Sequence, residues 1–66
     1  MDYSTRIEFS KQLVGLPRRE AGLLAYDAGV GTWVVSSREQ FFNSFTDNMI
    51  GIILNNDLVV VETVNW

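Results

Sequence analysis

The clearest secondary-structure signal lies in the C-terminal third of the chain. Two apolar runs, at 50–54 and 58–66, flank an Asn-Asn-Asp segment at 55–57. Asparagine reaches left-handed backbone angles more readily than most residues, although less readily than glycine, so this segment favours a tight type I′ turn. The pattern predicts two antiparallel strands joined as a hairpin.

The second strand of this hairpin is apolar on both of its sides. A two-layer domain covers one face of its sheet, so such a strand is either buried on two sides or part of a sheet that meets a partner molecule. Its last residue, a tryptophan, either caps the core or projects as an anchor for binding. We therefore predict a protein interface on one side of the strand and at its end, formed by Val59, Val61, Thr63 and Trp66.

Residues 38–48 carry the pattern of an amphipathic helix. Ser36 or Ser37 can cap its N-terminus, and Gln40 stands three residues after Ser37, in the capping-box position. Four apolar residues then recur close to helical spacing and could dock one face on a sheet: Phe41, Phe42, Phe45 and Met49.

The first segment of the chain fits two patterns. Tyr3, Ile7 and Phe9 lie on one side of an extended chain with polar residues on the other, as in a half-buried strand. The same segment could instead start a helix, with Asp2 or Ser4 as its N-cap. The strand is the first interpretation and the helix is the alternative.

Glycine and proline mark the boundaries in the middle of the chain. Pro17 could occupy the first turn of a short helix. Gly22 disfavours this helix by about 1 kcal/mol relative to alanine, so we predict a loop and then a strand at 22–27. The glycines at 28–31 indicate a turn, and the β-branched and aromatic residues at 32–35 predict the second strand of a hairpin.

Together these segments predict a single α+β domain over residues 1–66. The order β-β-β-α-β-β gives a small, mostly antiparallel sheet of four or five strands with one principal helix packed on one face. A chain of 66 residues is too short for a second core. Its hydrophobic content of 47% is enough for one small core.

The residue types that most catalysis needs are missing from the sequence. The chain has no cysteine and no histidine, which removes thiol chemistry, zinc–thiolate sites and the commonest general base. The acidic residues are scattered and form no evident catalytic pair. Glu62 shares one side of its strand with Val60 and Val64, where a solvated edge charge is the ordinary interpretation. We expect no catalytic residue, no cofactor and no metal, and therefore no enzyme.

Charge is distributed unevenly along the chain, whose net charge is −3. All five basic residues lie within the first 38 residues, whereas the last 28 contain four acids and no base. The arginines could contact a phosphate backbone, with Tyr26 or Trp33 beside them for base stacking. The negative net charge opposes nucleic-acid binding, which depends on neutralising phosphates. The candidate nucleic-acid contacts are Arg6, Arg18, Arg19 and Arg38.

No apolar run approaches the roughly 20 residues that span a bilayer. The N-terminus also lacks the basic and apolar regions of a signal peptide. We therefore expect no membrane association and a cytoplasmic location. The absence of cysteine fits that compartment without defining it.

By elimination, the sequence predicts a non-catalytic protein-interaction module that acts as an inhibitor or regulator by binding a partner protein. In size, acidity and compact α+β build it resembles small inhibitors encoded by phages and plasmids, including anti-CRISPR proteins and acidic mimics of nucleic acid. This resemblance is one of general class, without a shared motif. Two alternatives stay open: a homo-oligomeric structural or assembly subunit that pairs through the C-terminal strand, and a small nucleic-acid-binding regulator.

Overall fold

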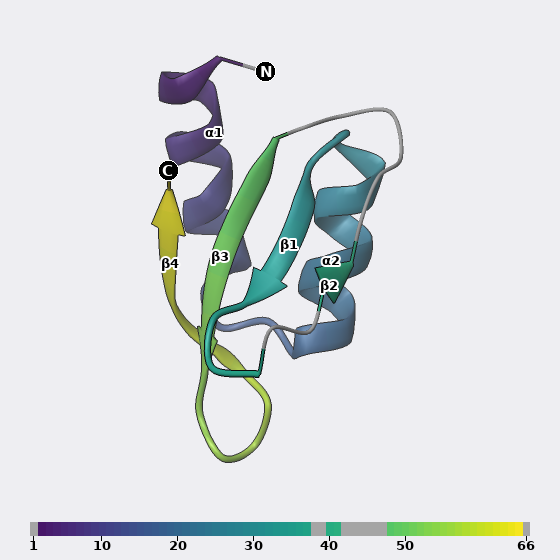
Figure 1. Cartoon of the computed structure of the whole chain (residues 1–66), viewed down its shortest axis with the longest axis vertical. Helices are drawn as coiled ribbons and strands as arrows, with labels where there is room; N and C mark the ends of the chain where they lie inside the picture. The colour runs from purple at the N-terminus through teal and green to yellow at the C-terminus, as the bar shows by residue number, and fades with distance from the viewer. Residues whose placement is uncertain (1, 38–39, 42–47, 66) are drawn as a thin grey trace.

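Figure 1 shows the computed structural model of the chain, which describes residues 2–37, 40–41 and 48–65. Its first half is helical and consists of helix α1 (Tyr3–Ser10), the 3-10 turn η1 (Lys11–Leu13) and helix α2 (Arg18–Asp27). The second half contains the strands β1 (Gly31–Val34), β2 (Gln40–Phe41), β3 (Met49–Leu54) and β4 (Val60–Asn65).

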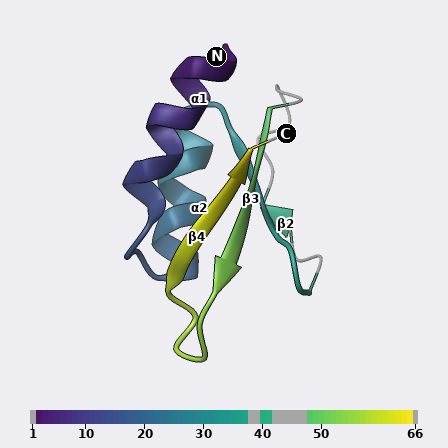
Figure 2. The ribbon, with the colours of Figure 1, turned by 90° about the vertical axis from the view of Figure 1, so that its left-hand side faces the viewer.

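The sheet is mixed, and both helices lie on one of its faces. The strand order is β2-β1-β3-β4, in which β1 and β3 are parallel and the other neighbours are antiparallel. Strands β1, β3 and β4 have four to six residues, whereas β2 has two. Figure 2 shows α1 and α2 together on one side of the sheet. The α+β class is confirmed, but the predicted element order, the single principal helix and the mostly antiparallel pairing differ from the structure.

The first segment is a helix, so the alternative interpretation is the correct one. Asp2 caps it, and its Oδ1 accepts a hydrogen bond of 2.7 Å from the Thr5 backbone N–H. This backbone hydrogen bond lowers the pKa of the Asp2 carboxyl. Over so few residues, an alternating pattern also contains the helical i, i+4 pair Tyr3 and Ile7, so the pattern could not separate a strand from a helix.

The strand predicted at 22–27 is wrong, because this segment belongs to helix α2. The helix buries residues that recur at helical spacing: Arg18, Ala21, Gly22 and Ala25. All but Arg18 have very small side chains. A face of small residues lets the helix approach the sheet closely, and α2 packs on β1. This packing outweighs the roughly 1 kcal/mol that a glycine costs a helix interior.

A Schellman motif closes the C-terminus of helix α2, with Gly29 directly after the C-cap residue Ala28. The Gly29 N–H donates to the Tyr26 carbonyl at 3.0 Å, and the Val30 N–H donates to the Ala25 carbonyl at 2.9 Å. This pair of bonds needs a left-handed residue, and Gly29 has a φ of 81°. The turn predicted at 28–31 is therefore a helix C-cap that leads directly into β1, and not the turn of a hairpin.

We expect the substitution Gly29→Ala to lower the free energy of unfolding by about 1–2 kcal/mol, because a Cβ is disfavoured at a left-handed φ. A Cβ at Gly29 meets no other atom within 4 Å, so the cost is conformational and not steric. Urea denaturation measures this loss. The control Ala28→Gly, at the neighbouring C-cap position, should cost only about 0.5 kcal/mol, and equal losses in the two variants would contradict the C-cap geometry.

Strands β3 and β4 form the hairpin that the sequence predicts, but its turn is not of type I′. The Oδ1 of Asn55 accepts hydrogen bonds from the backbone N–H groups of Asp57 at 2.9 Å and Val59 at 3.1 Å. The left-handed residue is Leu58, with a φ of 60°, and not an asparagine. The Asn55 side chain therefore closes a longer turn by accepting hydrogen bonds.

A β-bulge interrupts β4 at Val61. Ile53 pairs with Glu62 and Leu54 pairs with Val60, so Val61 is an extra residue without a partner in β3. A bulge shifts the alternation of side chains by one residue. Residues after Val61 therefore face the opposite side from the one that an unbroken strand from 58 to 66 predicts.

The helix predicted at 38–48 is contradicted where the structure describes this segment. Gln40–Phe41 is strand β2, which pairs antiparallel with β1. Pairing with the edge of β1 decides the backbone conformation here and overrides the local capping-box signal. The rest of the predicted helix, at 38–39 and 42–47, lies outside the described residues.

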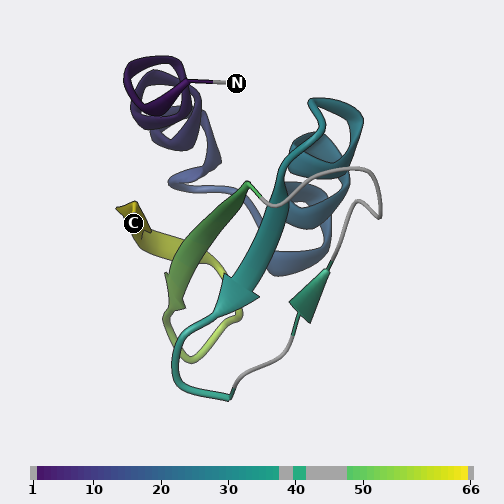
Figure 3. The ribbon, with the colours of Figure 1, turned by 45° about the horizontal axis from the view of Figure 1, so that its top comes forward.

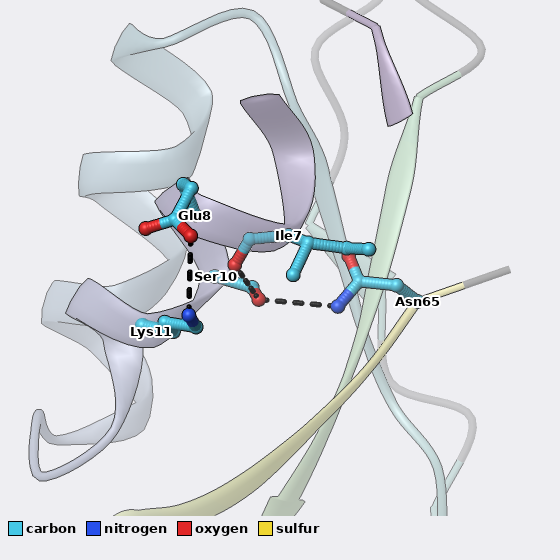
Figure 4. Close-up of polar contacts among 5 residues, drawn as sticks. All are labelled: Ile7, Glu8, Ser10, Lys11 and Asn65. Carbon is cyan, nitrogen blue, oxygen red and sulfur yellow. Dashed lines mark hydrogen bonds and ion pairs between the residues drawn. The ribbon is translucent and has the colours of Figure 1, made fainter. Parts of the chain in front are cut away.

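The core lies between the helices and the sheet. Its buried apolar residues come from every layer: Leu13, Ala21, Ala25, Val30, Val34, Ile50, Ile52 and Val60. Figure 4 shows how α1 is joined to β4: Asn65 Nδ2 donates to Ser10 Oγ at 3.1 Å, and Ser10 donates to the Ile7 carbonyl at 2.7 Å. The nearby ion pair between Lys11 and Glu8, at 3.1 Å, is exposed and adds little stability.

Thr32 of β1 places a hydroxyl in this apolar core. The residue is fully buried, and no described group hydrogen-bonds to its Oγ1. A buried polar atom without a partner costs about 1–3 kcal/mol, so we expect Thr32→Val to raise the free energy of unfolding by about 1 kcal/mol. Chemical denaturation checks this, with Thr32→Ser as a control that keeps the hydroxyl and should be destabilised. A destabilised Thr32→Val variant would instead show that the hydroxyl is satisfied.

Candidate functional site

The face of the sheet that points away from the helices is apolar. In β3, the core residues Ile50 and Ile52 alternate with Gly51 and Ile53, which therefore lie on the side away from the helices, where Ile53 is partly exposed and Gly51 is buried. The same alternation in β1 puts Trp33 on that side. The register of the strands joins Trp33, Gly51 and Val64 into one row across β1, β3 and β4.

We call this surface the open face, because no described helix lies on it (Figures 2 and 3). It consists of the residues on that side of β1, β3 and β4 and of the residues that directly adjoin them: Trp33, Val35, Met49, Gly51, Ile53, Val59, Glu62 and Val64. Val61, which is 51% exposed, borders it at the bulge. Glu62 is the one charged residue of this set. A contiguous apolar surface with few charges is typical of an interaction site.

The segment before α2 extends the open face past the edge of β4. Pro17 pairs antiparallel with Val59. On one side of this pair the Arg18 N–H donates to the Leu58 carbonyl at 2.7 Å, and on the other the Val60 N–H donates to the Leu16 carbonyl at 2.9 Å. Pro17 and Val59 thus form a non-hydrogen-bonded pair, the type of antiparallel pair in which side chains approach most closely. Gly15, with a φ of 91°, turns the chain into this pairing, and its N–H donates to the Val60 carbonyl at 2.8 Å in a G1-type bulge.

Leu58 combines two unfavourable features at the end of the open face. Its φ of 60° is left-handed, and its large apolar side chain is 61% exposed. A left-handed conformation costs a residue with a Cβ about 1–2 kcal/mol, and such strain concentrates at binding sites. Neither burial nor backbone preference therefore accounts for a leucine at this position.

We expect Leu58→Asn to raise the free energy of unfolding by about 1 kcal/mol, because asparagine tolerates the left-handed region and little apolar burial is lost. Thermal or urea denaturation measures the gain. Leu58→Ala keeps the conformational cost and should leave stability almost unchanged. A loss of stability in the asparagine variant would show that the Leu58 side chain supports the fold.

The residues predicted for the protein interface do not all meet on one surface. Val59 lies on the open face and Val61 borders it. Thr63 pairs with Ile52, which is buried, and so points toward the helices. The bulge at Val61 is the reason, since it shifts the alternation that the prediction assumed. Trp66 lies outside the described residues.

The predicted interface did not include the residues that β1 and β3 contribute to the open face, among them Trp33 and Ile53. The available signal was the uninterrupted apolar run at 50–54, which, like the C-terminal strand, has no polar side. A sheet with two such neighbouring strands has an apolar surface on both faces. The interface prediction used this argument for the last strand alone.

The arginines predicted to contact nucleic acid are not gathered in the structure. Arg6 of α1 donates to Asn48 Oδ1 at 3.3 Å and lies 5.5 Å from the Tyr3 ring centroid. Arg18 is only 8% exposed, and its backbone N–H donates to the carbonyl of Leu58, beside the start of β4. Asn48 directly precedes β3, so Arg6 and Arg18 lie at opposite ends of the hairpin, roughly 20 Å apart.

The described basic residues all lie in the helical half of the chain, which also carries the acids Asp2, Glu8, Glu20 and Asp27. The basic residues belong to α1, η1 and α2, where Lys11 and Arg19 are exposed, and Arg38 lies outside the described segments. The hairpin contributes Asp57 and Glu62, both acidic and exposed. The open face therefore has no described positive charge to hold a phosphate, which gives nucleic-acid binding no support from the geometry.

No known protein family, curated protein or solved structure matches this chain. Within 2–37, 40–41 and 48–65, no three acidic side chains come together as a metal site would need. None of the helices described for these residues is long and apolar enough to cross a membrane.

Proposed function

We propose that this chain is a non-catalytic protein-interaction module that binds a partner protein through the open face. The observation that supports this is the apolar surface that runs across β1, β3 and β4 without a covering helix among the described residues. Removing apolar surface from water is favourable and drives most protein–protein association. A partner would thus bury the side of the sheet that folding leaves open.

The size of the domain indicates how much of it a partner must cover. A stable protein interface buries about 800 Å² on each partner. The chain has an accessible surface of 4230 Å², so such an interface would take up roughly a fifth of it. A contact of this extent needs most of the open face together with Pro17 and Leu58 at its end.

Within this proposal, the chain is an inhibitor or regulator that acts in the cytoplasm by occupying a surface of its partner. Its small size and its pI of about 4.5 support this type of role, since phage- and plasmid-encoded inhibitors combine the same properties. An acidic chain also favours partners with basic surfaces, because charge complementarity speeds encounter and excludes wrong partners.

A comparison of capture by variants tests this proposal. The chain is immobilised, exposed to an extract of its native host, and the bound proteins are identified by mass spectrometry. Val59→Asp combined with Val61→Asp should abolish capture of the specific partner, because the added charges must be desolvated in the interface. Leu24→Asp, at an exposed apolar position of α2, is the control and should keep capture.

Circular dichroism confirms that each variant is folded before capture is compared. If the folded Val59→Asp, Val61→Asp variant retains the same protein as the unchanged chain, the open face is not the interface.

A further inference from the structure

Strand β4 forms one edge of the described sheet, and the first part of that edge is paired. In the order β2-β1-β3-β4, the neighbour of β4 is β3. On its outer side, the Val60 N–H donates to the Leu16 carbonyl and the Val60 carbonyl accepts from the Gly15 N–H. Beyond Val60, no backbone hydrogen bond joins the outer side of β4 to another described residue.

The hydrogen bonds of β3 determine which backbone groups of β4 face outward. The Val35 N–H donates to the Ile52 carbonyl at 3.0 Å, so the backbone groups of Ile52 point toward β1 and not toward β4. Thr63 lies opposite Ile52, and the two therefore form a non-hydrogen-bonded pair. Asn65 lies opposite Ile50, two residues away in both strands, and pairs in the same way. The backbone N–H and C=O groups of Thr63 and Asn65 thus point outward.

The described elements leave this part of the edge uncovered. Figure 2 looks onto the edge, and no described helix or strand lies in front of β4 in that view. Helix α1 packs beside β4, where the Asn65 side chain donates to Ser10. Proteins usually protect a sheet edge with lysine, proline or a bulge. The bulge at Val61 lies before residues 62–65, which contain no lysine and no proline.

The outward backbone groups of Thr63 and Asn65 are complementary to another extended chain. We infer that the partner protein adds an extended segment to β4 at 62–65 and forms main-chain hydrogen bonds with these two residues. The added strand would continue the sheet, so half of its side chains would extend the open face. This inference rests on the proposed function, since it describes how the partner of the open face binds.

Charge favours a basic segment. Glu62 is exposed on the open face and makes no ion pair with a described residue. A lysine or arginine on the same side of the added strand would lie next to it, and opposite charges on neighbouring strands stabilise a sheet. A second copy would instead add its own β4, in a hairpin whose described charges, Asp57 and Glu62, are both acidic. A segment of a different protein is therefore favoured over a second copy.

Linear peptides selected from a random display library for binding to the immobilised full chain test the inference. We expect the selected peptides to be rich in β-branched and basic residues. Thr63→Pro should weaken their binding at least about tenfold, because it removes the outward N–H and places a ring against the added strand. Proline is tolerated at an edge position whose N–H faces solvent. Thr63→Ala is the matched control, which keeps this N–H and should bind the peptides like the unchanged chain.

Amide hydrogen exchange of the unchanged chain gives a second measurement, which does not depend on a variant that folds. In the dilute chain without peptide, the Thr63 amide should exchange rapidly, whereas the Val64 amide, which faces β3, should exchange slowly. A saturating amount of a selected peptide should slow exchange at Thr63 at least about tenfold.

The inference is overturned if no peptide is enriched, if the enriched peptides bind a folded Thr63→Pro variant as well as the unchanged chain, or if the Thr63 amide stays unprotected in their presence. Protection of Thr63 that rises with the concentration of the chain alone would show that a second copy occupies the edge instead. In each of these cases, capture of a host protein that depends on Val59 and Val61 would leave the proposed function standing.

Discussion

The substitution Ile52→Ala is expected to unfold a large fraction of the protein under native conditions. Ile52 is fully buried in β3 and belongs to the core between the sheet and the helices. Truncating a buried isoleucine to alanine costs about 2–5 kcal/mol, and a domain of this size has a total stability of roughly 3–5 kcal/mol. Circular dichroism with urea titration measures the loss.

The neighbouring substitution Ile53→Ala is the control for this prediction. Ile53 lies on the open face and is partly exposed, so its truncation should cost about 1 kcal/mol. The same change at two consecutive positions thus separates the covered face of the sheet from the open one. Similar losses in the two variants would contradict the assignment of the faces.

The substitution Ala25→Leu is expected to have the second largest effect. Ala25 is fully buried on the small-residue face of α2, which packs on β1. A larger side chain would force the helix away from the sheet, and such overpacking costs about 1–3 kcal/mol. Thermal denaturation measures the loss. Leu24→Ala, at the adjacent exposed position, should change stability by less than about 0.5 kcal/mol.

If Ala25→Leu were neutral, the close approach of α2 to the sheet would be wrong. A strand at 22–27, as the sequence predicts, would then again be a possible conformation of this segment. The substitution therefore tests the largest difference between the predicted and observed folds.

Part of the fold follows from the sequence because it depends on local chemistry. The hairpin of β3 and β4 is bounded by a polar turn segment whose side chains close the turn, and β1 has the β-branched and aromatic residues of a strand. Asp2 also provides a recognisable cap for the first helix. Such signals act within a few residues and can be identified in a single sequence.

The rest of the fold depends on contacts between segments that are distant in sequence. Gly22 weakens a helix locally, yet it lies on the face that α2 packs against β1. Gln40 occupies a capping-box position, yet pairing with β1 places it in a strand. In both segments tertiary contacts outweigh a local preference of about 1 kcal/mol or less.

The candidate site was predicted in part for the same reason. An apolar strand without a polar side indicates a surface that needs a partner. On this ground Val59 and Val61 were predicted as interface residues. The bulge that turns Thr63 toward the helices depends on how β4 pairs with β3, and its position is not evident from side-chain type. The contribution of Trp33 required the strand order, which places β1 beside β3.

Solvent accessibility of the isoleucine and valine methyl groups tests the central claim most directly. Paramagnetic relaxation by a soluble gadolinium chelate can be measured by NMR for each methyl group of the dilute chain. The account predicts strong relaxation for Ile53, Val61 and Val64 and protection for Ile50 and Ile52. Protection of Ile53 and Val64 to the same degree as Ile52 would show that the face is already covered within the monomer, and would contradict an open face that binds a partner.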